Sequence, residues 1–232
     1  MSMTMAIGDL LADTGTRLHR RSADATALHE TGFFHDREMF NGLRETVLPR
    51  LIALNSATRR LRVWCAGCAT GQEAYSVGML LREYFAEQLA EWDVKIVGTD
   101  SAEDAVAYAR HGRYRRAEVN RGLPAKMLVK YFAREDEEWE IAPELRAMCE
   151  FREDDVCVPQ AGGQAFDLVL MRNVLLFLSP QERSSAFAGV YRQMAPHGVL
   201  ALGQAEQAED STELFEAEYM QGCCFYRPVA GA

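Results

Sequence analysis

A glycine loop between a strand pattern and a helix pattern is the feature that most constrains this chain of 232 residues. The strand-like run Leu61–Cys65 leads into a loop with glycine at positions 67 and 71, and a helix pattern begins at Gln72. Such a loop lets a ligand approach the backbone closely, and the free N–H groups of the helix start face it. The loop therefore predicts a cofactor site. A structural turn is the alternative, because the full G-x-G-x-x-G spacing of dinucleotide enzymes is absent.

A carboxylate at the end of the next predicted strand narrows the choice of cofactor. The run Asp93–Asp100 indicates a buried strand around Val94–Val97, and Asp100 stands at its tip, 29 residues after Gly71. Doubly wound folds hold the two ribose hydroxyls of a nucleotide with a carboxylate in this place. Asp100 therefore favours a cofactor with a ribose over a purely structural turn.

Strands and helices alternate along the rest of the chain. Further strands are expected at Cys149–Glu153, Phe166–Met171 and Val199–Gly203, and helices at Gln72–Ala90, Ala102–Arg110, Pro124–Phe132 and Pro180–Met194. This alternation predicts the α/β class, with a mostly parallel, doubly wound sheet covered by helices on both faces. Glu216–Gln221 and Cys223–Tyr226, on either side of Gly222, predict a C-terminal antiparallel hairpin.

Composition limits the class of protein. A chain of 232 residues with 48% hydrophobic residues can bury one sizeable core, so we expect one main domain at 29–232 after a short N-terminal extension at 1–28. No apolar run approaches the roughly 18 residues that cross a bilayer, and the N-terminus lacks the order of a signal peptide. We therefore expect a cytoplasmic protein with no direct membrane insertion. The net charge of −9 argues against nucleic acid as a partner.

Two clusters of charged or reactive side chains allow more than one interpretation. Five arginines between Arg110 and Arg121 form either a solvated surface or a docking surface for an acidic helical protein. Cys65 and Cys68 form a C-x-x-C without a second metal-binding pair, so we interpret them as small loop residues rather than a metal or redox site. Cys223 and Cys224 are adjacent in a predicted strand, where their side chains point to opposite faces, and no structural disulfide is expected.

Five motifs, in order from about Glu30 to Tyr226, resemble those of the chemotaxis receptor methyltransferases (CheR type). They are Thr31–Phe34 (T-G-F-F), Thr70–Ser76 (T-G-Q-E-A-Y-S), Gly98–Asp100 (G-T-D), Ala109–Tyr114 (A-R-H-G-R-Y) and Met171–Leu175 (M-R-N-V-L). The resemblance implies a Rossmann-like methyltransferase fold that binds S-adenosylmethionine and releases S-adenosylhomocysteine. It also implies methylation of glutamate side chains on a chemoreceptor or other helical signalling protein.

The resemblance assigns a set of residues to the cofactor. Gly67 and Gly71 would lie by its methionine part, Asp100 by the ribose, and Asp155 with Val156 beside the adenine. The full set is Thr31, Gly67, Gly71, Glu73, Asp100, Asp155, Val156, Arg172 and Asn173. Two alternatives to cofactor binding stay open. Glu73 could be only a carboxylate in the first turn of a helix, where it favours the helix N-terminus, and Arg172 could be a surface salt-bridge partner. No metal is required, because a sulfonium is an activated electrophile and positioning supplies much of the acceleration.

Several positions differ from the family pattern where the methyl group would react. His35 stands for the arginine of T-x-F-F-R, Phe177 for the tyrosine of R-N-V-x-I-Y-F, and Ala205 for the serine of G-H-S-E. A histidine lacks the fixed charged fork of arginine, and a phenylalanine lacks the hydroxyl. We assign His35 and Phe177 to the catalytic positions, with Phe177 as a core aromatic the alternative. Rival functions are a degenerate cofactor-binding relative acting as a regulatory module, a methyltransferase for another acceptor, and a dehydrogenase, which the terminal hairpin disfavours.

The long excursion Ser101–Met148 separates the second and third predicted strands. In the resembled family a small antiparallel subdomain is inserted here, and in some members it grips a tethering peptide at the receptor's end. The segment is shorter than the family's usual one, so we expect a reduced insert and no dependence on such a peptide. We also expect the family's N-terminal helical domain to be missing, or reduced to one helix within residues 1–28.

Overall fold

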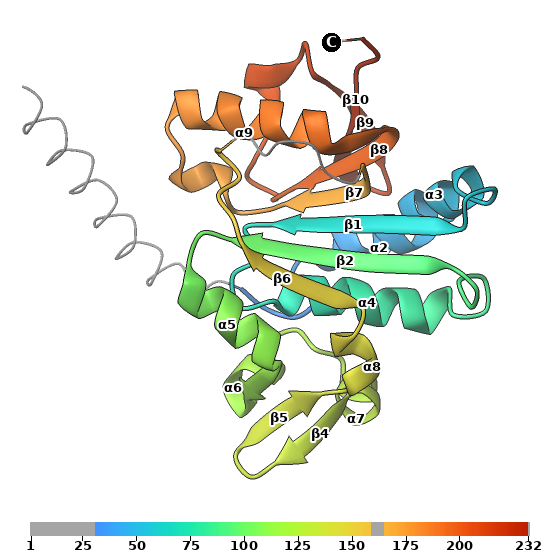
Figure 1. The fold of residues 1–232 in the computed structure, drawn as a ribbon, viewed down its shortest axis with the longest axis vertical. Helices are drawn as coiled ribbons and strands as arrows, with labels where there is room; N and C mark the ends of the chain where they lie inside the picture. The colour runs from blue at the N-terminus through green and yellow to red at the C-terminus, as the bar shows by residue number, and fades with distance from the viewer. Residues whose placement is uncertain (1–30, 159–164, 232) are drawn as a thin grey trace, which may run out of the picture. The chain divides into compact units, whose positions relative to one another are not determined.

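The computed structural model describes residues 31–158 and 165–231, and the expected extension at 1–28 lies outside the described residues. The chain divides into two units at Thr31, and the domain considered below begins at Gly32. A seven-stranded sheet in the order β6-β2-β1-β7-β8-β10-β9 forms its centre (Figure 1). The strands are β1 (Arg60–Ala66), β2 (Asp93–Asp100), β6 (Cys149–Glu153), β7 (Phe166–Met171), β8 (Met194–Leu202), β9 (Phe215–Met220) and β10 (Cys223–Pro228).

The pairing of these strands confirms the expected mostly parallel sheet. The pairs β6–β2, β2–β1, β1–β7 and β7–β8 are all parallel. Strand β10 is antiparallel to both β8 and β9, which confirms the C-terminal hairpin. The last parallel strand begins at Met194 rather than at the expected Val199, because Met194 already pairs with Phe166 on β7 before a register irregularity.

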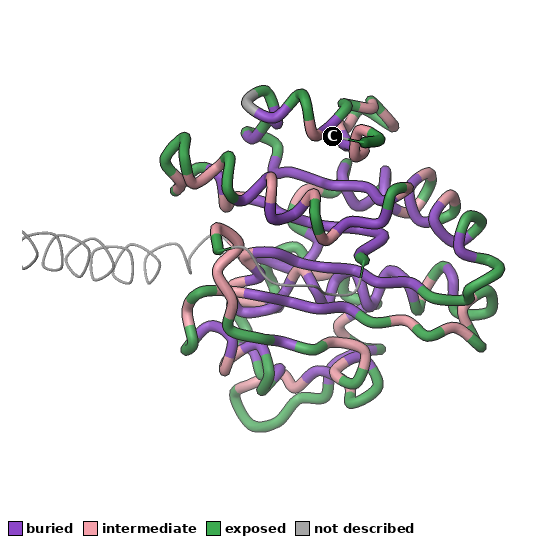
Figure 2. Tube along the Cα trace, turned by 45° about the horizontal axis from the view of Figure 1, so that its top comes forward, coloured by how far each residue is buried: buried purple, intermediate pink, exposed green. Residues whose placement is uncertain are grey.

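Helices cover both faces of the sheet. Side chains alternate across a strand, so Val63 and Cys65 of β1 belong to one core, and Trp64 and Ala66 to the other. The first core is closed by α2 (Arg37–Gly42), α3 (Leu48–Leu54), α4 (Gln72–Tyr84) and α5 (Glu103–His111), and the second by α9 (Pro180–Gln193). Figure 1 shows α2 behind β1 and α3 near the start of β1, and Figure 2 shows the central strands buried over most of their length.

The segment before β1 is helical, which the sequence analysis did not predict. Helix α2 continues through a π-helical turn at Leu43–Val47 into α3. The buried side chains recur three or four residues apart, as on one face of a helix: Met39, Leu43, Val47, Leu48 and Leu51. This spacing is the signal by which the helices could have been found.

Helix α4 ends at Tyr84, so the expected boundary at Ala90 was wrong. The sequence after Tyr84 is rich in alanine, glutamate and leucine, which favour helix. Phe85 leaves helical geometry with φ −130° and is buried in the core. A separate turn follows, in which Leu89 N–H donates to the Phe85 carbonyl at 2.9 Å. Burial of the Phe85 ring therefore overrides local propensity.

The excursion between β2 and β6 folds into a three-stranded antiparallel sheet with short helices, seen at the foot of Figure 1. We call it the insert. Its elements are β3 (Arg113–Arg115), α6 (Arg116–Val119), α7 (Ala125–Tyr131), β4 (Phe132–Glu135), β5 (Glu138–Ile141) and α8 (Pro143–Arg146). The helix expected at Pro124–Phe132 is confirmed as α7.

Aromatic side chains attach the insert to the main sheet. The ring of Phe33 meets Tyr114 and Phe132 edge-on, with centroids 5.0 and 5.4 Å apart. The Tyr114 hydroxyl donates a 2.7 Å hydrogen bond to the carbonyl of Thr70, in the glycine loop. Gly122 must lack a side chain, because a Cβ there would lie 2.1 Å from the Phe33 carbonyl oxygen. The insert is thus fixed directly to the loop that the sequence marks as a ligand site.

Cys65 and Cys68 are buried in the first core. All six cysteines are free thiols. Burial raises the pKa of both the Cys65 and the Cys68 thiols well above the ordinary value, which keeps them protonated and argues against a reactive C-x-x-C.

Within the part of the chain that the structure describes, no helix has the length and apolar character needed to cross a membrane.

Candidate functional site

The candidate site lies where the strand order of the sheet reverses. From β1 the chain continues to β2 on one side, and from β7 it continues to β8 on the other. Ligands of doubly wound sheets bind outside the carboxyl ends of the strands at such a switch point. The glycine loop after β1 meets the loop after β7 here, since a Cβ on Gly67 would lie 2.4 Å from Cγ2 of Val174.

The glycine loop needs its glycines for reasons internal to the chain. Gly67 has φ +70° and Gly71 has φ +89°, in the left-handed region. A Cβ on Gly71 would also lie 2.8 Å from the Cβ of Ala109 and 3.1 Å from the Phe151 ring. Gly71 caps the start of α4, so the first N–H groups of that helix open onto the switch point. Contact of these glycines with a cofactor stays a prediction.

Asp100 ends β2 and holds the glycine loop in place. Its Oδ2 accepts a hydrogen bond from Ala69 N–H at 2.7 Å, and its Oδ1 accepts one from Ala102 N–H at 3.0 Å. Burial raises the pKa of the Asp100 carboxyl, although the backbone donors partly oppose the shift. Asp100 thus lies at the strand tip where the sequence analysis expected a ribose ligand.

Arg172 is buried in an ion-pair network, so the alternative of a surface salt-bridge partner was wrong, and its assignment to the cofactor stays a prediction. The residue is 8% exposed. Its Nη1 lies 2.6 Å from Glu73 Oε2, and its Nη2 lies 3.4 Å from Asp36 Oδ2. Burial alone lowers the pKa of this guanidinium, but Glu73 and Asp36 outweigh it and raise the pKa above its ordinary value. The network joins the end of β7, the first turn of α4 and the start of α2.

Glu73 therefore has two roles that are compatible. It stands in the first turn of α4, where a carboxylate favours the helix N-terminus, and it is also the nearest charge partner of Arg172. Contact of the Glu73 carboxylate with a cofactor stays a prediction.

Glu206 organises the loop after β7, and the sequence analysis did not assign it to the site. Its carboxylate accepts three backbone hydrogen bonds, from Asn173 and Leu175 at 2.7 Å each and from Gly203 at 2.8 Å. Asn173 has φ +58°, an unusual backbone conformation for a residue other than glycine. Glu206 thus stabilises the strained turn that carries Asn173. The only sequence signal was its place in the segment matched to the G-H-S-E motif.

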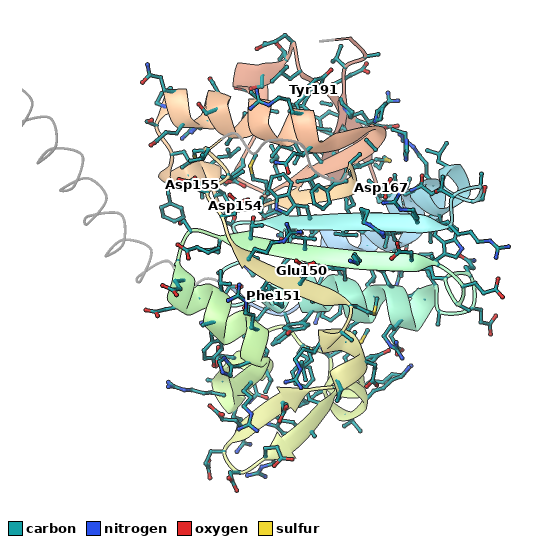
Figure 3. The ribbon with its side chains drawn as sticks, viewed as in Figure 1. Glu150, Phe151, Asp154, Asp155, Asp167 and Tyr191 are labelled. Carbon is teal, nitrogen blue, oxygen red and sulfur yellow. The ribbon has the colours of Figure 1, made fainter. Side chains whose placement is uncertain are left out.

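Asp155 and Val156 follow β6 at the same edge of the sheet. Both are half-buried, and Asp155 Oδ1 accepts a hydrogen bond from Cys157 N–H at 2.9 Å. The neighbouring Asp154 N–H donates to the Asp100 carbonyl at 3.0 Å, which joins this loop to the tip of β2. Figure 3 shows Asp154 and Asp155 at this edge, and Asp167 at the opposite edge of the sheet.

The two residues assigned to catalysis are both exposed. His35 lies between Phe34 and Asp36, whose φ values of +49° and +73° are left-handed. Phe177 ends the 3₁₀ turn η2 (Leu175–Phe177) and is 59% exposed, so the alternative of a core aromatic was wrong. Thr31 is half-buried at the end of the preceding unit. The contacts of all three with cofactor or substrate stay predictions.

The residues at the switch point fit a cofactor that carries ribose hydroxyls. An ionised carboxylate has about four lone-pair sites, and the backbone N–H groups of Ala69, Ala102 and Ser101 leave one of them on Asp100 for a ligand hydroxyl. The Nε–H of Arg172 is buried without a hydrogen-bond partner among the described residues. A buried donor without a partner is unusual, and this one fits a polar group of a bound cofactor.

Comparison with known proteins agrees with this geometry. The family model "CheR methyltransferase, SAM binding domain" matches residues 29–223. Chemotaxis protein methyltransferase 1 of Pseudomonas aeruginosa is 31% identical over 228 residues, which cover 96% of this chain and 83% of that protein. Chemotaxis protein methyltransferase Cher2 of Pseudomonas putida is 32% identical over 192 residues, 82% of this chain and 70% of the other. The chain therefore belongs to the CheR methyltransferase family, which it matches over that family's S-adenosylmethionine-binding domain.

Proposed function

We propose that this protein is an S-adenosylmethionine-dependent O-methyltransferase of the chemoreceptor type, which methylates glutamate side chains on a helical partner protein. The observation that carries the proposal is Asp100, which backbone N–H groups hold at the tip of β2 and which keeps an acceptor site for a ligand. Membership of the CheR family and relatives named chemotaxis methyltransferases support the reaction type. The chemoreceptor as partner comes from those relatives' names.

The chain's own residues bind and orient the reactants. Asp100 would accept a hydrogen bond from the ribose, Asp155 and Val156 would border the adenine, and the glycine loop would lie along the methionine part. The bound cofactor supplies a methyl group on a sulfonium, which is already an activated electrophile. The ion pairs of Arg172 with Glu73 and Asp36 hold the loops after β1 and β7 in fixed positions relative to each other.

The reaction requires no general base, because a glutamate side chain with a pKa of about 4.3 is ionised near pH 7. Acceleration then depends on holding carboxylate and sulfonium in line and on excluding water. We assign His35 and Phe177 to orienting the carboxylate, since they occupy the positions of the family's arginine and tyrosine. Neither supplies the donors of the residue it replaces, so we expect slow transfer with ordinary cofactor affinity.

Two measurements test the proposal together. Calorimetric titration with S-adenosylmethionine and S-adenosylhomocysteine measures binding, and transfer of a radiolabelled methyl group to membranes containing chemoreceptors measures activity. Alkali should release the label, because a glutamate methyl ester is hydrolysed whereas a methylated amine is not. An alkali-stable label would identify a different acceptor. Tight cofactor binding without transfer to any receptor would favour the regulatory binding module instead.

A further inference from the structure

A cleft beside the candidate site has no role in the mechanism above. It has a volume of about 360 Å³ and lies between the start of α2, the loop after β8 and the β9–β10 hairpin. Ligand sites typically have volumes of roughly 300–1,000 Å³. The cleft adjoins the site, because Asp36 belongs both to its wall and to the Arg172 network, and Glu206 belongs both to its wall and to the loop of Asn173.

The walls of the cleft combine apolar surface with carboxylates. The apolar part of its wall includes Phe215 and Tyr226, whose side chains are otherwise buried in the protein. Its four carboxylates are Asp36, Glu38, Glu206 and Glu209, and none of the described residues that line it is lysine, arginine or histidine. A concave site with apolar walls and one sign of charge concentrates the electrostatic field and attracts the opposite charge.

Two of the four carboxylates are not compensated within the described chain. Asp36 is paired with Arg172, and Glu206 accepts three backbone hydrogen bonds. Glu38 and Glu209 are both exposed, and no ion pair to another described residue is found for either. The negative field is felt at Cys223 in the cleft wall, where burial and then the charges of Asp36 and Glu38 raise the pKa of the thiol.

We propose that this cleft binds a lysine or arginine side chain of the partner segment that carries the accepting glutamate. The proposal rests on the proposed function, which it deepens by naming what the enzyme recognises beside the glutamate. The aliphatic stem of such a side chain covers the apolar wall while its cation lies near Glu38 and Glu209. The cation also offsets the repulsion that the acidic cleft exerts on an approaching glutamate. A partner without a neighbouring cation is therefore disfavoured.

The test uses helical peptides with one acceptor position. In each peptide a lysine stands three or four residues before or after that position, so that both side chains share a helix face. Matched peptides carry norleucine, which keeps the aliphatic stem and lacks the charge. In a binding series the acceptor glutamate is replaced by glutamine, and in a transfer series it is kept. For at least one spacing, we expect lysine to improve both Kd and KM about tenfold over norleucine.

Cleft variants locate the effect. The double variant Glu38→Gln with Glu209→Gln should remove the lysine preference and leave the Kd for S-adenosylmethionine unchanged. The control Glu87→Gln with Glu144→Gln makes the same change of net charge at two exposed positions outside the cleft lining, and it should keep the preference. Equal affinity of lysine and norleucine peptides for the unmodified protein at every spacing would overturn the proposal.

The two series separate this inference from the proposed function. Lysine preference in the glutamine peptides, with no transfer to the glutamate peptides, would support the cleft assignment while the proposed function failed. Transfer with equal KM for lysine and norleucine would support the function and overturn the cleft assignment. A dimer of the unmodified protein that becomes monomeric in the cleft double variant would also overturn it, because a second copy of the chain would then occupy the cleft.

Discussion

At the scale of single residues, the carboxylate of Asp100 holds the backbone of the glycine loop and is our predicted ligand for the cofactor's ribose. Its carboxylate accepts backbone hydrogen bonds from Ala69, Ala102 and Ser101, and about one lone-pair site is left for a ligand. We predict that Asp100→Ala weakens S-adenosylmethionine binding by about 1–3 kcal/mol, because hydrogen bonds to a charged acceptor are lost. Calorimetric titration measures the change. Affinity equal to that of the unmodified protein would remove Asp100 from the site.

The raised pKa of Asp100 gives a second prediction, for the dependence of binding on pH. Burial shifts this pKa upward from the ordinary value of about 3.9. As the pH falls through the raised pKa, the carboxyl takes up a proton and becomes a poorer acceptor. Cofactor affinity should therefore fall with pH earlier than an ordinary aspartate would allow. In Asp100→Asn this titration disappears, and an unchanged pH profile in that variant would assign the effect to another group.

The third prediction concerns His35 and Phe177: we expect this protein to bind the cofactor with ordinary affinity but to transfer the methyl group slowly. Both are exposed, so their replacement disturbs little packing. One positioning hydrogen bond at a transition state contributes on the order of 2–4 kcal/mol, or a hundredfold or more in rate. We expect His35→Arg together with Phe177→Tyr to raise kcat for receptor methylation and leave cofactor affinity unchanged. Brisk methylation by the unmodified protein, with no gain in the double variant, would show that these differences are neutral.

At the scale of secondary structure elements, Arg172 is the point where β7, α4 and α2 are joined. Its side chain is 5% exposed, and those of Glu73 and Asp36 are 16% and 15% exposed. Removing one partner of a buried ion pair leaves the others uncompensated, and the typical loss is roughly 3–5 kcal/mol. We therefore expect Arg172→Met to lower the free energy of unfolding by about that amount, as measured by urea denaturation without cofactor.

A matched variant distinguishes burial from charge alone. Arg59 and Glu91 form an ion pair with side chains 59% and 79% exposed. Exposed pairs of this kind contribute less than about 1 kcal/mol. Glu91→Ala should therefore have little effect on the same denaturation curve. Equal losses in Arg172→Met and Glu91→Ala would mean that the buried network contributes no more than a surface pair.

Elements whose signal is local were predicted well from the sequence. The bounds of β6 and β7 were confirmed at both ends, since each is a short extended run. Helix α4 was extended too far, because the burial of Phe85 depends on tertiary contacts that no local window contains. The candidate site shows the same division. Asp100 could be placed from its strand, whereas Glu73 and Asp36 lie 99 and 136 residues from Arg172 along the chain. Asn173 and Leu175 lie 33 and 31 residues from Glu206.

At the scale of the whole molecule, the insert bears on how the protein finds its partner. Its three strands are short, and β4 lies at one edge of the small sheet. We predict that association with receptors does not depend on a receptor tail peptide, because the sequence leads us to expect an insert shorter than the family's usual one. Adding such a peptide to a pull-down should leave receptor association unchanged. Strong competition by the peptide would instead assign it to an exposed edge of the insert.

The hydrogen bond from Tyr114 to Thr70 limits how this protein can be re-engineered. The insert cannot be exchanged for that of a relative, in order to change the choice of partner, without also keeping its contacts to the main sheet. The graft must bring a tyrosine that reaches the Thr70 carbonyl, an aromatic surface for Phe33 and a residue without a side chain at position 122. A chimera that lacks these features would bring its new partner to a cofactor loop that had lost one of its supports.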